Sequence, residues 1–301
     1  MKFTSPAAVL IIKGTIAAHG RIDAPIVFDG VDASMGGAAL QISAHGAASV
    51  NMSHATFRNF GQAVGFECCW SANLLWFQDC VFEQNDAAVG GYNGMTVVFL
   101  RCEFANNMRP VTGGYFQFDG CFFHSQESGA VVGGSTFTSC VFMNHTGLAL
   151  GAPDATITDS LFVWNDIAVR PVDYARGPVV LRSSIINNRL GMMRGSGVHL
   201  SDVNLCGNTD SNFVLLSEDD ARISRCWLGT ASHFEAYKFV SSSTHVRFPW
   251  NCFALAQFQQ ISTISYFSGP KFRPLDIMQR AWSLFCFWSL RVCRWLGRRS
   301  V

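Results

Sequence analysis

The segment Phe99-Leu100-Arg101-Cys102-Glu103-Phe104 recurs along the chain with small changes, and this recurrence decides the fold. It returns as Phe118-Asp119-Gly120-Cys121-Phe122-Phe123 and as Phe137-Thr138-Ser139-Cys140-Val141-Phe142. Each copy has an apolar residue, two variable residues, a cysteine or small residue, one variable residue and a closing apolar residue. The closing residues read from this pattern are Phe57, Phe82, Phe104, Phe123, Phe142, Phe162, Ile186, Leu205 and Leu228.

The spacing of these copies predicts one coil of strands per repeat. Successive closing residues are separated by 25, 22, 19, 19, 20, 24, 19 and 23 residues, too few for a pair of helices. Asparagines follow two or three residues later, at Asn59, Asn85, Asn106, Asn107, Asn144, Asn165, Asn188 and Asn208, and short glycine-ended strands come next. Asn and Gly tolerate the left-handed backbone of sharp corners. We therefore expect a right-handed parallel β-helix of about ten coils over residues 8–255, with Phe, Cys and Asn each stacked on their own kind.

The composition supports a large packed core and excludes some functions. Hydrophobic residues make up 49% of the 301 residues and charged residues 14%, with a net charge of +1. No basic cluster occurs before residue 270, which argues against nucleic-acid binding. The 11 cysteines include no C-x-x-C pair, so no metal site is predicted. A column of Cys80, Cys102, Cys121, Cys140 and Cys226, continued by Ser160, Ser184 and Val203, is interpreted as packed small side chains.

Several motifs resemble those of known β-helix proteins. The stretch 14–20, Gly-Thr-Ile-Ala-Ala-His-Gly, followed by Pro25-Ile26-Val27-Phe28, is similar to the opening coils of the pectin-lyase-like superfamily. Phe82-Glu83-Gln84-Asn85 and Phe162-Val163-Trp164-Asn165 resemble the Phe-x-x-Asn repeats of polymorphic outer-membrane proteins. This resemblance covers about residues 8 to 255 and implies the β-helix fold. It also favours an extracellular or cell-surface location, although the chain begins with no clear signal peptide.

The resemblance leaves two function classes open. The first is a non-enzymatic repeat protein that acts as a surface or carbohydrate-contacting scaffold. The second is a polysaccharide lyase or glycoside hydrolase of the pectin-lyase-like type, and a calcium ion is expected only for a lyase. A cluster of acidic side chains on adjacent coils would favour the enzyme. The sequence shows no such column, so we expect the scaffold.

The predicted ligand-binding residues surround an insertion between two coils. Arg170 and Arg194 each follow a closing residue, Phe162 or Ile186, by eight positions and are expected to stack in adjacent coils. The insertion between them carries Asp173, Tyr174 and Arg176. Two cations beside an aromatic ring and a carboxylate could hold an acidic sugar. The structural alternative is that these charges simply face the solvent.

One motif points to the enzyme alternative. Asn208-Thr209-Asp210 and the pair Asp219-Asp220 resemble the carboxylates of pectin-degrading hydrolases, in which paired carboxylates act as acid and base. The two elements are separated by about half a coil in this chain, and Asn208 already fits the corner pattern. We therefore expect these residues to be structural.

The last part of the chain, residues 256–301, departs from the repeat. Ala281 to Leu290 is apolar and aromatic, and an arginine-rich stretch follows to Arg299. A helix here would place Arg280, Arg291, Arg294 and Arg298 within about 60° of one another. We expect an amphipathic helix, and three roles stay open for it. It could cap the last coil, contact a membrane surface through Ala281 to Arg299, or be an unstructured tail.

Overall fold

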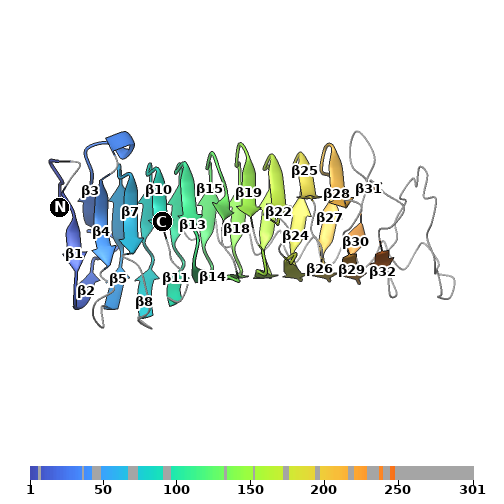
Figure 1. Ribbon diagram of the computed structural model, residues 1–301, viewed down its shortest axis with the longest axis horizontal. Coiled ribbons are helices and arrows are strands. Elements are labelled where there is room, and N and C mark those ends of the chain that lie inside the picture. The colour runs from blue at the N-terminus through green and yellow to red at the C-terminus, as the bar shows by residue number, and fades with distance from the viewer. Residues whose placement is uncertain are drawn as a thin grey trace. The chain divides into compact units, whose positions relative to one another are not determined.

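The described part of the protein is an all-β parallel solenoid, as predicted. The computed structural model describes residues 1–5, 8–35, 37–42, 49–66, 74–90, 96–131, 134–151, 153–171, 176–193, 197–215, 220–228, 237–239 and 245–247. Their strands lie side by side along one axis (Figure 1), and every ladder between them is parallel. A short 3₁₀ turn, η1 (Ala33–Met35), is the one helical element among these residues.

Each coil contributes one strand to each of three sheets, which we call sheets A, B and C. Sheet A has ten strands: β3 (Ile26–Asp29), β6 (Ala55–Arg58), β9 (Val81–Glu83), β12 (Glu103–Ala105), β15 (Phe122–His124), β18 (Val141–Met143), β21 (Leu161–Val163), β24 (Ser184–Ile186), β27 (Asn204–Cys206) and β30 (Trp227–Leu228). Sheet B has eleven: β1 (Leu10–Ile12), β4 (Ala38–Ile42), β7 (Gln62–Phe66), β10 (Ala87–Gly90), β13 (Arg109–Thr112), β16 (Ala130–Val131), β19 (Leu148–Gly151), β22 (Ile167–Arg170), β25 (Leu190–Met193), β28 (Ser211–Leu215) and β31 (Tyr237–Phe239). Sheet C also has eleven: β2 (Thr15–His19), β5 (Ser49–Ser53), β8 (Leu74–Gln78), β11 (Thr96–Leu100), β14 (Tyr115–Asp119), β17 (Thr136–Thr138), β20 (Thr156–Thr158), β23 (Val179–Leu181), β26 (Val198–Ser201), β29 (Asp220–Ser224) and β32 (His245–Arg247).

Two columns of phenylalanine fill the interior. The predicted stack of Phe82, Phe104, Phe123, Phe142 and Phe162 is confirmed, because all five rings are fully buried and neighbouring rings lie parallel at 4.5–5.0 Å. A second column from sheet C meets the first edge-on, as Phe118 does with Phe123 at 5.3 Å. Stacked and edge-on aromatic pairs contribute about 0.5–1.5 kcal/mol each beyond the area they bury. The coils are therefore joined through their centre by continuous aromatic packing.

The cysteine column also lies inside, but one of its predicted members is wrong. Cys80, Cys102, Cys121 and Cys140 are at most 1% exposed and none forms a disulfide. Burial raises the pKa of the Cys102 and Cys140 thiols, so these thiols are poor nucleophiles. The column continues through Ser160 to Ser183, whose hydroxyl oxygen accepts a hydrogen bond from the Ser160 backbone N–H at 3.0 Å. Ser184 instead pairs with Leu161 on the outer side of sheet A.

A ladder of buried amide side chains marks the corner between sheets A and B. The Oδ1 atom of Asn107 accepts hydrogen bonds from the backbone and the side chain of Asn85, both at 3.0 Å, and its Nδ2 donates to the Phe82 carbonyl at 2.9 Å. The same pattern joins Asn165, Asn188 and Asn208. These bonds satisfy groups that would otherwise be buried without partners.

Three of the predicted asparagines do not belong to this ladder. Asn59, Asn106 and Asn144 each precede a ladder position and have φ angles of 62°, 52° and 58°. They supply the left-handed residue that turns the corner. Gln126 and His145 occupy the ladder positions in the two coils between Asn107 and Asn165, and the pattern search missed both because neither is an asparagine.

His145 occupies a ladder position in which one of its ring nitrogens is buried without a hydrogen-bond partner among the described residues. Its Nδ1 lies 2.8 Å from the Asn165 Oδ1, and since an amide oxygen only accepts, Nδ1 carries the proton. The Nε2 atom is buried and has no hydrogen-bond partner among the described residues. Burial lowers the pKa of His145 to about 4, and the nearby His124 acts in the same direction. The protonated form is therefore unfavourable inside the solenoid.

We expect this histidine to make the fold sensitive to mild acid. Its pKa falls from 6.5 to about 4 on folding, so the unfolded chain binds more protons between these values and stability is lost as the pH drops through them. At pH 4.5 the loss should be about 2–3 kcal/mol relative to pH 7. Urea unfolding of the wild type and of His145→Asn at both pH values measures it. The variant should lose less than the wild type by that amount, and equal losses would contradict the assignment.

Some predictions concern residues that the structure does not describe. The C-terminal extension 256–301, its amphipathic helix and the last predicted repeat, Phe248 to Phe253, lie outside the described residues. Among the residues that are described, no helix is long and apolar enough to cross a membrane.

Candidate functional site

The predicted stacking of Arg170 on Arg194 involves a residue that the structure does not describe and stays a prediction. Arg170 ends β22, and Val169 in that strand pairs with Met192 of β25, which places Met193 beside Arg170. Arg194 comes one residue later and lies outside the described residues, as do Asp173 and Tyr174. Arg176 is described and exposed.

The predicted register of the coil that contains Ile186 is wrong by one residue, because two neighbouring pairs of apolar residues fit the repeat pattern. Ile185, not Ile186, stacks on Phe162, and Val180, not Leu181, pairs with Ile157. Val180 and Ile185 are fully buried, whereas Leu181 and Ile186 are half-buried on the outer surface. The positions predicted from Ile186 are therefore shifted by one residue relative to the observed register of this coil.

Among the described residues, several arginines pair with a carboxylate of the preceding coil. Arginines contact carboxylates in the pairs Asp29–Arg58, Asp79–Arg101, Asp86–Arg109, Asp159–Arg182, Asp166–Arg189 and Asp202–Arg225. The hydrogen bonds from Arg225 lower the pKa of Asp202, and those from Arg58 lower the pKa of Asp29. These carboxylates are engaged in structural pairs and are poorly placed for acid–base catalysis.

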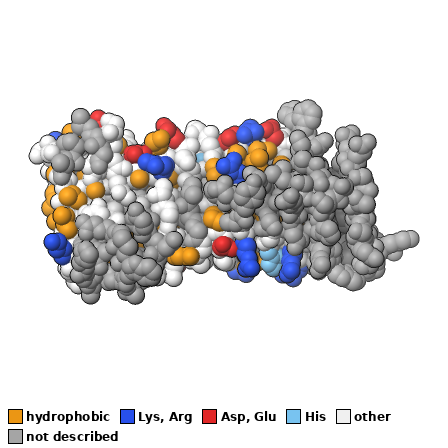
Figure 2. Space-filling view, viewed as in Figure 1, with side chains coloured by type: hydrophobic (Ala, Val, Ile, Leu, Met, Phe, Trp, Pro, Cys, Tyr) orange, Lys and Arg blue, Asp and Glu red, His pale blue; other side chains and the backbone are white. Residues whose placement is uncertain are grey.

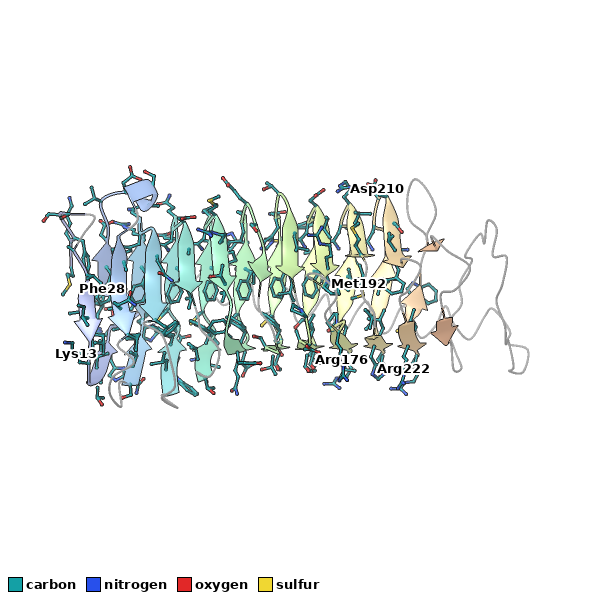
Figure 3. All side chains as sticks on the ribbon, viewed as in Figure 1. Lys13, Phe28, Arg176, Met192, Asp210 and Arg222 are labelled. Carbon is teal, nitrogen blue, oxygen red and sulfur yellow. The ribbon has the colours of Figure 1, made fainter. Side chains whose placement is uncertain are left out.

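The outer face of sheet C carries cations that do not follow this pairing. His199 of β26 pairs with Arg222 of β29, which pairs with Arg247 of β32, so these positions lie about 4.8 Å apart along the solenoid. Arg176 and Arg222 lie on the same edge (Figure 3), where blue and pale blue side chains gather in the space-filling view (Figure 2). We call Arg176, His199 and Arg222 the cationic strip.

The described residues contain no ion-pair partner for this strip. Arg176 and Arg222 are exposed and His199 is half-exposed, yet no carboxylate of the described residues forms an ion pair with any of the three. Asp154, one coil before Arg176, contacts it only through the backbone. Three adjacent coils therefore present positive or protonatable groups together, which makes this the described surface best suited to an anion.

Towards the N-terminus, the same face of sheet C carries mostly uncharged polar side chains. Tyr115 is 51% exposed, and Gln117, Thr136 and Thr156 form one exposed column across β14, β17 and β20. The Tyr115 ring lies against Gly134 in the next coil, where any β-carbon would meet the ring at 2.4 Å. This glycine therefore leaves the space that the aromatic side chain occupies. Hydroxyl and amide groups beside a fixed aromatic ring can contact sugar hydroxyls and ring faces.

The catalytic motif of the enzyme alternative is structural in this chain. Asn208 is fully buried in the amide ladder, and Asp210 forms an ion pair with Arg189 at 2.7 Å. Asp219 is not described, and Asp220 begins β29 in sheet C, two residues before Arg222. Figure 3 shows Asp210 and Arg222 on opposite edges of the solenoid. Among the described residues, no group of three or more His, Cys, Asp or Glu side chains could hold a metal ion.

The fold and this surface define a parallel β-solenoid protein with a cationic outer strip. No protein-family model and no curated protein matches the sequence. Among solved structures, the catalytic domain of Agl-KA is similar at 10% identity and a TM-score of 0.40, and the match covers 81% of this chain but only 62% of that one. An alginate lyase from Paenibacillus sp. str. FPU-7 has 9% identity and a TM-score of 0.32, with coverage of 82% and 91%.

A mannuronic acid-specific family 6 polysaccharide lyase from human gut microbiota is similar to the same degree. Its identity is 10% and its TM-score 0.33, with 88% of this chain and 84% of that chain covered. At TM-scores below 0.5, these likenesses carry no argument about what this protein does.

Proposed function

We propose that this protein is a non-enzymatic scaffold, a right-handed β-solenoid that binds an acidic glycan along the outer face of sheet C. The observation that carries the proposal is the cationic strip, which lacks the ion pairs that six described arginines form with carboxylates of the preceding coil. A bound polyanion would supply the counter-charge that Arg176 and Arg222 lack among the described residues, which supports a ligand rather than a structural role.

The ligand-binding surface proposed here includes the insertion predicted from the sequence. Arg170 ends β22 and Arg176 precedes β23, so the segment that carries Asp173 and Tyr174 connects sheet B to the start of the strip. In the sequence, Arg194 comes between β25 and β26, and we propose that it contributes to the same surface. Guanidinium groups can bind carboxylates through two parallel hydrogen bonds, which suits a polymer of uronic acids.

Surface scaffolding accounts for the chemistry better than catalysis does. Asp210 of the hydrolase motif is held in an ion pair with Arg189, and the strip offers cations that form no ion pair with a described carboxylate. Binding through such exposed charges should weaken as salt rises, because exposed charges are screened. We therefore expect the protein to bind an acidic glycan without cleaving it, at a cell surface or outside the cell.

The test is affinity electrophoresis through gels that contain alginate or polygalacturonate. The wild type should be retarded, and Arg176→Ala with Arg222→Ala should weaken binding roughly tenfold or more, because each charged hydrogen bond contributes about 1.5–3 kcal/mol. Arg170→Ala with Arg194→Ala tests the insertion in the same gels and should also abolish most retardation. The matched control removes the same charge at the other end, with Lys13→Ala and Arg21→Ala, and should change binding less than about twofold.

Two results would overturn the proposal. Retardation of the strip variant equal to that of the wild type, with both proteins folded, would remove the strip as a binding site. Release of unsaturated or shortened oligosaccharides from either polymer, with or without calcium, would show an enzyme in place of a scaffold.

A further inference from the structure

Among the residues that the structure describes, Trp164 is the one exposed tryptophan, and it lies at the corner between sheets A and B. Trp164 is 59% exposed and has a φ angle of 57°, in the left-handed region. The residues in the same position of the two adjacent coils are Asn144 and Asn187, with φ angles of 58° and 55°. Asparagine suits this backbone, whereas a bulky indole side chain does not.

The left-handed backbone of Trp164 costs conformational free energy, and the exposed indole gains little stabilisation from burial. Every other described residue in this corner column, from Asn59 to Gly207, is Asn, Gln, Ser or Gly. An indole exposed over more than half of its surface stabilises the core far less than the phenylalanines inside. Strained residues at a protein surface are typical of binding sites, where the ligand makes the contacts that the fold does not.

The groups around Trp164 are those that bind sugar hydroxyls. The side-chain amides of Asn144 and Asn187 are exposed and have no hydrogen-bond partner among the described residues. On the adjacent column, the Arg189 guanidinium contacts Asp166 and, at 2.7 Å, Asp210. Only the Oδ2 atom of Asp210 takes part in that contact, so Oδ1 is available as an acceptor.

We propose that Trp164 is the platform of a second binding site, which takes a pyranose ring of a neutral glycan. The apolar face of the sugar would stack on the indole, and its hydroxyls would bind the amides of Asn144 and Asn187, which lie one coil to either side. Two carboxylates share one arginine here, so the corner has a net charge of −1 and disfavours an acidic sugar. Asp210, in the column next to the site, lies on the edge of the solenoid opposite Arg222 (Figure 3), and the site does not depend on the cationic strip.

The test compares neutral polysaccharides with the wild type and with Trp164→Asn. Mixed-linkage β-glucan, galactomannan and arabinoxylan are cast into native gels, and at least one should retard the wild type. Trp164→Asn installs the residue of both neighbouring coils, so the variant should melt at the same temperature or higher while its retardation falls at least tenfold. Ile22→Asn is the matched control, because it replaces another exposed apolar side chain by the same residue, and its retardation should equal that of the wild type.

Fluorine NMR of 5-fluorotryptophan protein gives an independent readout. The chain has 8 tryptophans, and the signal that disappears in Trp164→Asn belongs to Trp164. Addition of the retarding polysaccharide should shift or broaden that signal. The proposal is overturned if none of the three polymers retards the wild type, or if Trp164→Asn is retarded as strongly. Alginate binding in the same variant should stay intact, so failure of this site is distinguishable from failure of the strip.

Discussion

Replacement of Phe123 by Asp should destabilise the solenoid by at least about 4 kcal/mol. The side chain is fully buried, and its ring lies between Phe104 at 4.6 Å and Phe142 at 4.7 Å. The variant loses both stacking contacts and places a carboxylate where no cation or hydrogen-bond donor of the core can reach it. Urea unfolding followed by circular dichroism measures the change, and we expect either a large shift of the midpoint or no folded protein.

The control for this prediction uses the alternation of the neighbouring strand. Val141 directly precedes Phe142 in β18 but points outward and is half-buried. Val141→Asp introduces the same charge about one coil away and should cost less than about 1 kcal/mol. A similar loss in both variants, or an unchanged midpoint for Phe123→Asp, would show that the inward and outward positions of sheet A have been exchanged.

Replacement of Asn107 by Ala should cost about 3–5 kcal/mol. The Asn107 side chain is 1% exposed, accepts from Asn85 and donates to the Phe82 carbonyl. Without it, the Asn85 backbone N–H and the Phe82 carbonyl stay buried without partners, and each such group costs about 1–3 kcal/mol. Thermal and urea unfolding at pH 7 measure the loss.

The adjacent residue provides a control with the same side chain. Asn106 is exposed, and its φ of 52° suits glycine. Asn106→Gly therefore removes an identical amide while it keeps the corner conformation, and we expect a change of less than about 1 kcal/mol. If Asn106→Gly were more destabilising than Asn107→Ala, the buried ladder would run through Asn106 and not through Asn107.

The contrast between Asn106 and Asn107 shows what a repeat pattern leaves open. Both residues fit an asparagine two or three positions after a closing phenylalanine, and only the contacts between coils separate them. Asn107 faces inward and meets Asn85, while Asn106 turns the chain. The same limit applies to Gln126 and His145, which take ladder positions without being asparagine. Hydrogen bonding in the ladder depends on position, so composition alone could not find them.

The candidate site was also predictable only in part from the sequence. Arg176 was recognised from the charges of its insertion, but His199 and Arg222 come from later coils and carried no motif. Their register became visible only when Val179, His199 and Arg222 were aligned across β23, β26 and β29. Trp164 was visible as part of a Phe-x-x-Asn repeat, yet its left-handed backbone and exposure depend on the folded corner.

The repeat pattern was sufficient to predict the parallel β-solenoid and the residues of its inner columns. A spacing of 19 to 25 residues with Phe and Cys at constant offsets leaves room for only one strand-rich coil per repeat. Only the tertiary structure decided the register of the coil that contains Val180 and Ile185, since Leu181 and Ile186 match the same pattern. The physical reason is that alternate residues of a strand face opposite sides, so a shift of one residue exchanges core and surface. Burial of Val180 and Ile185 against Ile157 and Phe162 selects one register, and that choice sets which cations meet on the outside.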